Sequence, residues 1–270
     1  MGTDLNQNVN SNQNLNSNSN LNSKTSAASN AANPKVISGS GSVAEALASA
    51  IKAALRYEAN AEKPTMGIYR PSLLPLCLRR QWLIYKKGLP VSEEKAGIFR
   101  IGELFHGFLS RAFRSSGLDV RAEEAPFMIV LLSEGKEPKL GLGPGLRISG
   151  RADLILAIDG EAYVIEAKSI RRLPSEPLRH HVAQLQLYLA GLGLKRGFLV
   201  YLDKEALRHA IFPIEYDASL LRGILERARR LHEALLSDRS PEPDGEPWEC
   251  GYCEFRGECE GKTGRGGRGV

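Results

Sequence analysis

The sequence of 270 residues contains no apolar run long enough to cross a membrane, which takes roughly 20 residues. Its longest apolar runs, such as FMIVLL directly after Pro126, have the length of a β-strand. The N-terminus is rich in Asn and Ser and lacks the apolar segment of a secretory signal. These absences argue against a membrane or secreted protein, and we expect a cytoplasmic one.

Cysteine is also scarce, and the four that occur are Cys77, Cys250, Cys253 and Cys259. In the cytoplasm such residues are metal ligands or free thiols more often than disulfides. The stretch CGYCEFRGEC has the spacing C-x₂-C-x₅-C, and Cys77 lies far upstream. Three clustered cysteines and a distant fourth predict a four-thiolate site. Zinc and iron–sulfur clusters both accept four cysteines, so the count does not choose between them.

The charge is moderately positive, with a net charge of +5. Lys and Arg recur in clusters, which are Arg79, Arg80, Lys86, Lys87, Arg171, Arg172, Arg227, Arg229 and Arg230. A positive excess favours a polyanionic partner, although any single cluster is equally well explained as a solvated helix face.

The composition divides the chain into a core and two tails. Residues 1–41 are dominated by Asn and Ser and are predicted to be disordered. Ser42 and Glu45 form a capping-box pattern for a helix running to about residue 60. A core over 42–245 precedes a cysteine-bearing segment over 246–262 and a flexible basic tail over 263–270.

The periodicity predicts an α/β fold. We expect a short helix after Pro75 and a long one from about 92 to 116, whose apolar face is Ile101, Leu104, Phe105, Phe108, Leu109 and Phe113. A strand bent at Pro126, a hairpin, and a helix over about 176–192 follow. The last elements are strands near 196–203 and 207–216 and a helix over 218–236. This order predicts a mixed sheet flanked by helices.

The hairpin RISGRADLILAIDGEAYVIEAKS carries charges in an otherwise apolar segment. The DG pair at 159–160 is a strong two-residue turn signal. With that turn, Asp153 lies directly across from Glu166, and Lys168 lies on the same face of the sheet. Both faces of the hairpin are largely apolar, so we expect it to be central and covered on both sides.

Two opposed carboxylates need a compensating charge. At about 5 Å and an effective dielectric constant of about 20, Asp153 and Glu166 repel each other by roughly 3 kcal/mol. A divalent cation between them makes the net electrostatic interaction attractive, and Mg²⁺ prefers such oxygen ligands. Lys168 would then orient water or a phosphate oxygen. The alternative is an ion-paired cluster in which Lys168 only balances one carboxylate.

The motif GRAD followed by EAK resembles the D…E-x-K core of the PD-(D/E)XK nucleases, with Ala152 where that family has Pro. His106 in GELFHG resembles the helix-borne metal-binding histidine of the RecB-like branch. Gln184 and Tyr188 in QLQLY resemble its Q-x-x-x-Y motif, and at this spacing they share one helix face.

The resemblance extends to CRISPR-associated RecB-like exonucleases over roughly residues 65–260. It implies a restriction-endonuclease-like core over 42–245 and a 4Fe–4S cluster on one N-terminal and three C-terminal cysteines. It also implies metal-dependent cleavage at single-stranded DNA ends, trimming spacer precursors in CRISPR adaptation alongside the integrase complex. The implied ligands of Mg²⁺ or Mn²⁺ are His106, Asp153, Glu166 and the carbonyl of Ala167. The implied catalytic and positioning residues are Asp153, Glu166, Lys168, Gln184 and Tyr188.

Other interpretations stay open. The same residues suit a DNA repair or replication nuclease without a CRISPR role, and the cysteines also suit zinc or a non-catalytic DNA-binding scaffold. Glu123 and Glu124 are weaker candidates for a further ligand. We expect His180 and His181 to be solvated surface residues. The remaining expectation is that Arg79, Arg80, Arg171 and Arg172 track the DNA backbone.

Overall fold

The computed structural model describes residues 43–55, 63–131 and 145–263. The chain divides into two units, residues 1–50 and 51–270, and helix α1 (Val43–Leu55) extends across the boundary between them. Several predictions lie outside the described residues: the disordered tail, the capping serine at 42 and the basic tail beyond 263. Among the described helices, none combines the length and the apolar character that crossing a membrane requires.

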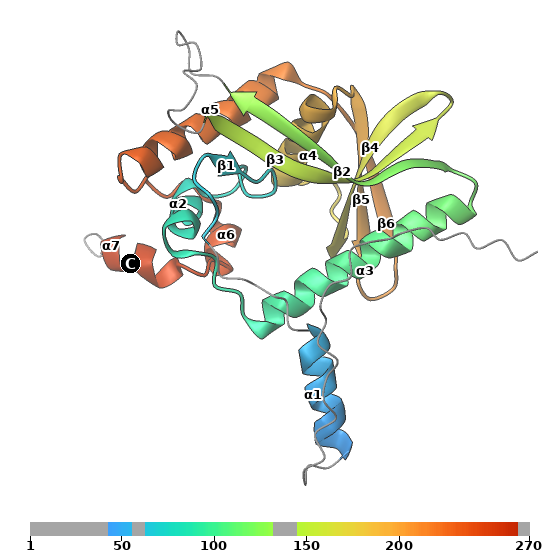
Figure 1. Ribbon diagram of the computed structural model, residues 1–270, viewed down its shortest axis with the longest axis horizontal. Helices are drawn as coiled ribbons and strands as arrows, with labels where there is room; N and C mark the ends of the chain where they lie inside the picture. Colours follow the sequence, from blue (N-terminus) through green and yellow to red (C-terminus); the bar gives the residue numbers. More distant parts are fainter. Residues whose placement is uncertain (1–42, 56–62, 132–144, 264–270) are drawn as a thin grey trace, which may run out of the picture. The chain divides into compact units, whose positions relative to one another are not determined.

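The second unit is built on a six-stranded mixed sheet with the order β1-β3-β4-β5-β6, in which β2 also pairs with β3 (Figure 1). The strands are β1 (Ile68–Tyr69), β2 (Asp119–Leu131), β3 (Leu146–Ile158), β4 (Glu161–Ile170), β5 (Arg196–Asp203) and β6 (His209–Glu215). The pairs β1–β3 and β4–β5 are parallel, and the other pairs are antiparallel. The predicted mixed sheet is confirmed.

The described part of this unit has six further helices: α2 (Leu78–Lys87), α3 (Glu93–Ser115), α4 (Arg179–Leu192), α5 (Ala218–Leu236), α6 (Pro247–Gly251) and α7 (Arg256–Thr263). Their ends follow local chemistry. The Ser92 side chain accepts a hydrogen bond from the Lys95 amide and caps α3. Asp217 caps α5 in the same way, and Gly193 ends α4 in the left-handed conformation.

The β3–β4 hairpin is covered on both faces, as the sequence predicts. On one face, Leu154, Leu156 and Ile165 pack with Leu109 of α3. On the other face, Val164 belongs to the larger core that α4 and α5 complete. Each fully buried aliphatic side chain of this kind contributes about 1.5–3 kcal/mol. The hairpin is therefore the rigid centre of the fold.

The predicted apolar face of α3 is wrong in part. Leu109 is buried and Phe105 and Phe113 are partly buried, which gives a narrow stripe of every fourth residue against the sheet. Leu104 remains 71% exposed, and Ile101 and Phe108 are exposed as well. The helix packs on the sheet along one narrow stripe, so the apolar residues beside it face outward.

The sequence predicts a strand broken or bent at Pro126, and β2 is not broken there. Pro126 pairs with Arg151 within a regular part of the ladder. An edge strand tolerates proline where the missing N–H faces away from its neighbour, and β2 pairs with β3 alone among the described strands. The irregularity lies earlier, where the register shifts between Val120 and Ala122 and Glu124 has a φ of 49°.

Candidate active site

The hairpin turn has the geometry that its sequence predicts. Asp159 and Gly160 have φ values of 52° and 81°, and two consecutive positive φ angles define the type I′ turn that joins strands tightly. The resulting register pairs Ile158 with Glu161 and continues to Leu154 opposite Ile165. The predicted register is confirmed over this stretch.

Asp153 and Glu166 lie where the two strands part. The paired residues of β3 and β4 end at Leu154 and Ile165, while β4 continues beside β5. In place of a regular ladder bond, Asp153 Oδ2 accepts a hydrogen bond of 2.8 Å from the Ala167 amide. We call this point, where the pairing of β3 with β4 ends, the opening; side chains of α3 and α4 reach it from the two faces of the sheet.

His106 reaches the opening from α3, which covers one face of the sheet. Its Nε2 atom lies 3.4 Å from Asp153 Oδ2 and 3.3 Å from the carbonyl oxygen of Ala167. The helix therefore brings an imidazole to the same point as a carboxylate and a backbone carbonyl. These are the groups for which the resemblance predicted a metal site.

Lys168 is held from the other face by α4. Its Nζ atom lies 2.6 Å from Glu166 Oε1 and donates a hydrogen bond of 3.0 Å to Gln184 Oε1. Gln184 Nε2 in turn donates a hydrogen bond of 2.6 Å to the hydroxyl of Tyr188. The glutamine and tyrosine thus fix the position of the lysine through one chain of contacts.

The two carboxyl groups are in an unfavourable electrostatic environment. Burial raises the pKa of Asp153 to about 6, although Lys168 opposes the change. Burial, and then the charge of Asp153, raise the pKa of Glu166 to about 8. Burial acts to lower the pKa of Lys168, but the charges of Glu166 and Asp153 outweigh it, and the pKa is raised. A further positive charge would stabilise both carboxylates.

One carboxylate oxygen of Glu166 is a position at which such a positive charge could bind. Its side chain is 1% exposed, and its Oε2 atom has no hydrogen-bond partner among the described residues. Buried carboxylate oxygens are almost always paired, and hard divalent cations bind such oxygens. His106 and Asp153 lie beside it, so the residues at this opening fit a divalent metal ion.

Glu124, a weaker candidate in the sequence, lies with the other proposed ligands. Oxygen and nitrogen atoms of His106, Glu124 and Asp153 lie within 4.8 Å of one another. The β2–β3 register pairs Glu123 with Leu154 and Ala125 with Ala152, which puts Glu124 opposite Asp153. Both glutamates also form exposed ion pairs, Glu124 with Arg151 at 3.2 Å and Glu123 with Arg114 at 2.8 Å.

The two histidines at the start of α4 are not the solvated pair that we predicted. His181 Nδ1 lies 3.0 Å from the hydroxyl of Tyr201 on β5, and its ring centroid lies 4.0 Å from that of His180. Burial and then the charge of Lys168 lower the pKa of His181 to about 2 and of His180 to about 4. The first turn of α4 packs over the end of β5, which the local sequence does not reveal.

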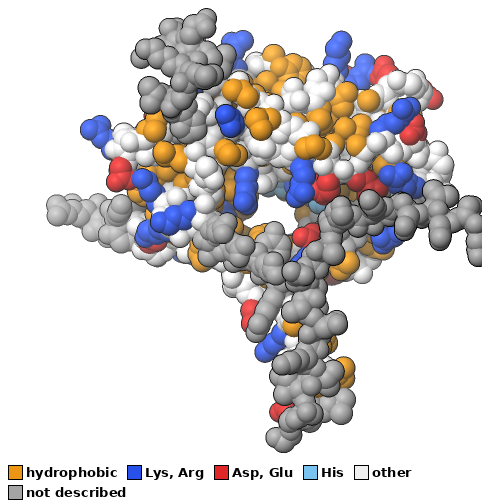
Figure 2. Space-filling view, in the orientation of Figure 1, with side chains coloured by type: hydrophobic (Ala, Val, Ile, Leu, Met, Phe, Trp, Pro, Cys, Tyr) orange, Lys and Arg blue, Asp and Glu red, His pale blue; other side chains and the backbone are white. Residues whose placement is uncertain are grey.

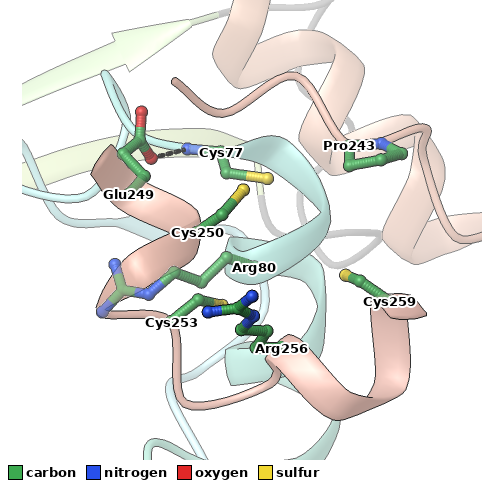
Figure 3. A pocket seen from close by; sticks show the side chains of 8 residues that line it. All are labelled: Cys77, Arg80, Pro243, Glu249, Cys250, Cys253, Arg256 and Cys259. Carbon is green, nitrogen blue, oxygen red and sulfur yellow. Dashed lines mark hydrogen bonds between the residues drawn. The ribbon is translucent and has the colours of Figure 1, made fainter. Parts of the chain in front are cut away.

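The four cysteines line a cavity of about 260 Å³. Figure 3 shows Cys77 at the start of α2, Cys250 on α6, Cys253 in the following turn and Cys259 on α7. A methyl group at Gly245 would lie 2.9 Å from Cys77 Cβ, so glycine keeps the space beside that cysteine open.

The donor set fits a four-thiolate group. Arg80 and Arg256 also line the cavity, and Arg80 is paired with Glu254. The segment is also fixed independently of its thiols. Glu249 accepts a hydrogen bond of 2.8 Å from the Cys77 amide, and Asp244 accepts one of 2.7 Å from the Leu78 amide. Both carboxylates lie at the N-terminus of α2, where negative charge is stabilised.

Two of the arginines expected to follow DNA are structural instead. Arg79 is buried and donates a hydrogen bond of 2.8 Å to the Pro241 carbonyl. Arg80 donates hydrogen bonds of 2.9 and 3.0 Å to the two carboxylate oxygens of Glu254. Arg171 and Arg172 are exposed, and neither forms an ion pair within the described part of the chain.

The comparisons with known proteins agree with this geometry. Residues 117–260 match the family model described as the PD-(D/E)XK nuclease superfamily, and the chain belongs to that superfamily. It is 33% identical over 121 residues to the CRISPR-associated exonuclease Cas4 of Saccharolobus solfataricus. That match covers 44% of this chain and 55% of the relative, so the chain spans about half the length of the curated protein.

Two solved structures are similar in fold. The crystal structure of a protein designated SSO0001 superposes with a TM-score of 0.59 at 24% identity, over 80% of this chain and 97% of that one. An alkaline exonuclease of Laribacter hongkongensis superposes with a TM-score of 0.43 at 14% identity, over 64% and 90% of the two chains. The first supports the fold, and the second overlaps too little to support an argument.

Proposed function

We propose that this protein is a cytoplasmic, metal-dependent nuclease that hydrolyses DNA from single-stranded ends. The observation that carries the proposal is the buried Glu166 carboxylate, which has one oxygen without a hydrogen-bond partner in the described residues. Asp153 and His106 lie beside it, and Lys168 is fixed against its other oxygen. An ordinary ion-paired cluster accounts for the lysine but leaves that second oxygen unexplained.

Mg²⁺ or Mn²⁺ is the cofactor that suits these ligands, which would be His106, Asp153, Glu166 and the carbonyl of Ala167. Such an ion supplies activation of water and neutralisation of the charge that develops on the phosphate. The ammonium group of Lys168 donates a hydrogen bond to a phosphate oxygen or to the attacking water. Gln184 and Tyr188 hold that ammonium group in place.

A polyanionic substrate agrees with the charges around the opening. Arg171 and Arg172 directly follow the last residue of β4 and are exposed. Figure 2 shows Lys and Arg side chains, together with Asp and Glu, along the described upper border of the hollow near the middle of this view. Phosphate contacts of this kind make the affinity for DNA fall steeply as the salt concentration rises.

The CRISPR role rests on the similarity to the archaeal exonuclease. We propose that the protein trims spacer precursors during CRISPR adaptation, together with the integrase complex. A repair or replication nuclease would use the same site residues. Loss of new spacer acquisition after deletion of the gene, restored by the wild type and not by Lys168→Ala, would distinguish the two roles.

The four cysteines would hold a 4Fe–4S cluster that joins the C-terminal segment to α2. Four thiols in one cavity, with arginines beside them, support this proposal. Protein purified without oxygen should be brown and contain about four iron atoms per chain. A colourless protein with one zinc atom would contradict the cluster and leave the nuclease proposal intact.

The nuclease proposal is tested with single-stranded DNA labelled at either end, in the presence of Mn²⁺. Wild-type protein should release short products, and Lys168→Ala should lower the rate about a hundredfold or more. Lys195→Ala is the matched control, because Lys195 is exposed and lies at the start of β5, away from the site residues. Equal rates for wild type and Lys168→Ala would reject the proposed site.

A further inference from the structure

Trp248 connects the cysteine segment to the helix that fixes the catalytic lysine. It lies on α6, next to Glu249 and Cys250. Its ring centroid is 4.9 Å from that of His180, with an angle of 35° between the ring planes. A core tryptophan would be buried, but this side chain is 48% exposed. Its indole is therefore both held in place and available to a ligand.

The tryptophan lies close to the proposed active site. His180 is in the first turn of α4, one helical turn before Gln184, which accepts a hydrogen bond from Lys168. The charge of Lys168 also contributes to the lowered pKa of His180. A strand bound at the catalytic lysine thus passes within reach of the His180–Trp248 pair.

A cavity of about 340 Å³ adjoins this pair and is lined by Trp248. Phe99 and Tyr252 supply two further aromatic side chains, and Tyr252 is 79% exposed. Its polar wall has two cations, Arg80 and Lys95, which both pair with Glu254, and a second carboxylate, that of Glu249. An aromatic cavity with balanced charge suits a flat, uncharged ring better than a phosphate.

Cationic side chains lie on the connection from β4 to α4. Arg171, Arg172 and Arg179 are exposed there, between Lys168 and His180 in the sequence. In the described part of the chain, none of the three forms an ion pair. The segment therefore has positive charge for a phosphate backbone, and its last arginine directly precedes His180, whose ring contacts that of Trp248. This combination is typical of single-strand binding sites.

We propose that Trp248 and the adjoining cavity form a nucleobase subsite, in which an unpaired base of the DNA strand stacks on the indole. The subsite rests on the proposed function and defines its substrate, because bases in a duplex are paired and stacked and do not enter such a cavity. The proposed subsite also gives the cysteine segment a second role, because this segment holds Trp248 beside the active site.

The test separates bases from phosphates. The full chain, purified without oxygen, is titrated in EDTA with labelled oligothymidylate and with an abasic oligonucleotide of the same length. Wild-type protein should bind oligothymidylate about tenfold more tightly. Trp248→Ala should lose this preference while binding the abasic strand with unchanged affinity, and Trp248→Phe should keep part of it. Tyr216→Ala, which removes another exposed aromatic residue, should behave as wild type.

Four results would overturn the subsite. Wild-type protein could bind both oligonucleotides equally, or Trp248→Ala could keep the preference for bases. Loss of affinity for both strands in Trp248→Ala would mean that the indole only holds α6 in place. A change in sedimentation of Trp248→Ala, with the base preference retained, would instead assign the cavity to contact between two copies of the chain.

The same experiment distinguishes the subsite from the nuclease proposal, because binding in EDTA does not require cleavage. A base preference that depends on Trp248, in a protein that never degrades DNA with Mn²⁺, would support the subsite and reject the nuclease. Cleavage by a wild-type protein without base preference would reject the subsite alone.

Discussion

The substitution Asp153→Asn should stabilise the protein while abolishing its activity. Burial raises the pKa of Asp153 from 3.8 to about 6, and each pKa unit corresponds to about 1.4 kcal/mol. The ionised carboxylate therefore costs the metal-free fold on the order of 3 kcal/mol at pH 8. Asparagine keeps the oxygen that accepts the hydrogen bond from the Ala167 amide and removes the charge.

The size of this stabilisation depends on pH. A carboxyl group whose pKa is higher in the folded state than in the unfolded state destabilises the fold above its folded pKa, and the penalty disappears below its unfolded pKa. The gain from Asp153→Asn should thus be absent near pH 4 and complete above about pH 7. For a unit of this size, about 3 kcal/mol at pH 8 raises Tm by roughly 6–12 °C.

Thermal unfolding in EDTA at several pH values measures the gain directly. Asp203→Asn is the control, and its effect on stability should have the opposite sign. Hydrogen bonds from the Glu205 amide and from Arg208 lower the pKa of Asp203, so its charge stabilises the fold. That variant should be less stable than wild type at pH 8. Adding Mn²⁺ should raise the Tm of wild-type protein more than that of Asp153→Asn. A gain in Tm that does not change with pH, or a loss at pH 8, would refute the electrostatic reasoning.

Three further predictions follow from other contacts. Burial acts to raise the pKa of Glu254, but its two cationic partners, Arg80 and Lys95, hold that pKa at about 2. Glu254→Gln should therefore lower Tm near pH 7, and the difference in Tm from wild type should disappear as the pH falls toward 2. Gln184→Ala should lower the cleavage rate about tenfold to a hundredfold by releasing the catalytic lysine, and Tyr188→Phe should lower it less, as single-turnover rates would show. Replacing both Arg171 and Arg172 with Gln should reduce the slope of log affinity against log salt by up to about 2.

The local parts of the active site could be predicted from the sequence. The DG turn and the alternation of apolar residues determine the register of one hairpin, because both depend on residues that are close in the chain. The same reasoning gave the shared helix face of Gln184 and Tyr188. Motif resemblance then supplied His106, which comes from a helix on the opposite face of the sheet.

The remaining parts depend on contacts between distant segments. Glu124 faces Asp153 because of the β2–β3 register, and the loop between those strands gives no short turn signal from which to count. Trp248 meets His180 only after the C-terminal segment has docked on α2. Arg80 lies in a basic run that looks like a DNA-binding surface, yet Glu254 pairs with it from the far end of the chain.

The central claim is that His106, Asp153 and Glu166 share one divalent cation at the point where β3 and β4 part. Anomalous diffraction from crystals of the full chain grown with Mn²⁺ tests it most directly. The account predicts one strong manganese peak within about 2.0–2.4 Å of a carboxylate oxygen of each acid and of a histidine nitrogen, and no peak in Glu166→Gln. A manganese peak at another place, with Lys168 still paired with Glu166 and no ion at the opening, would contradict the claim.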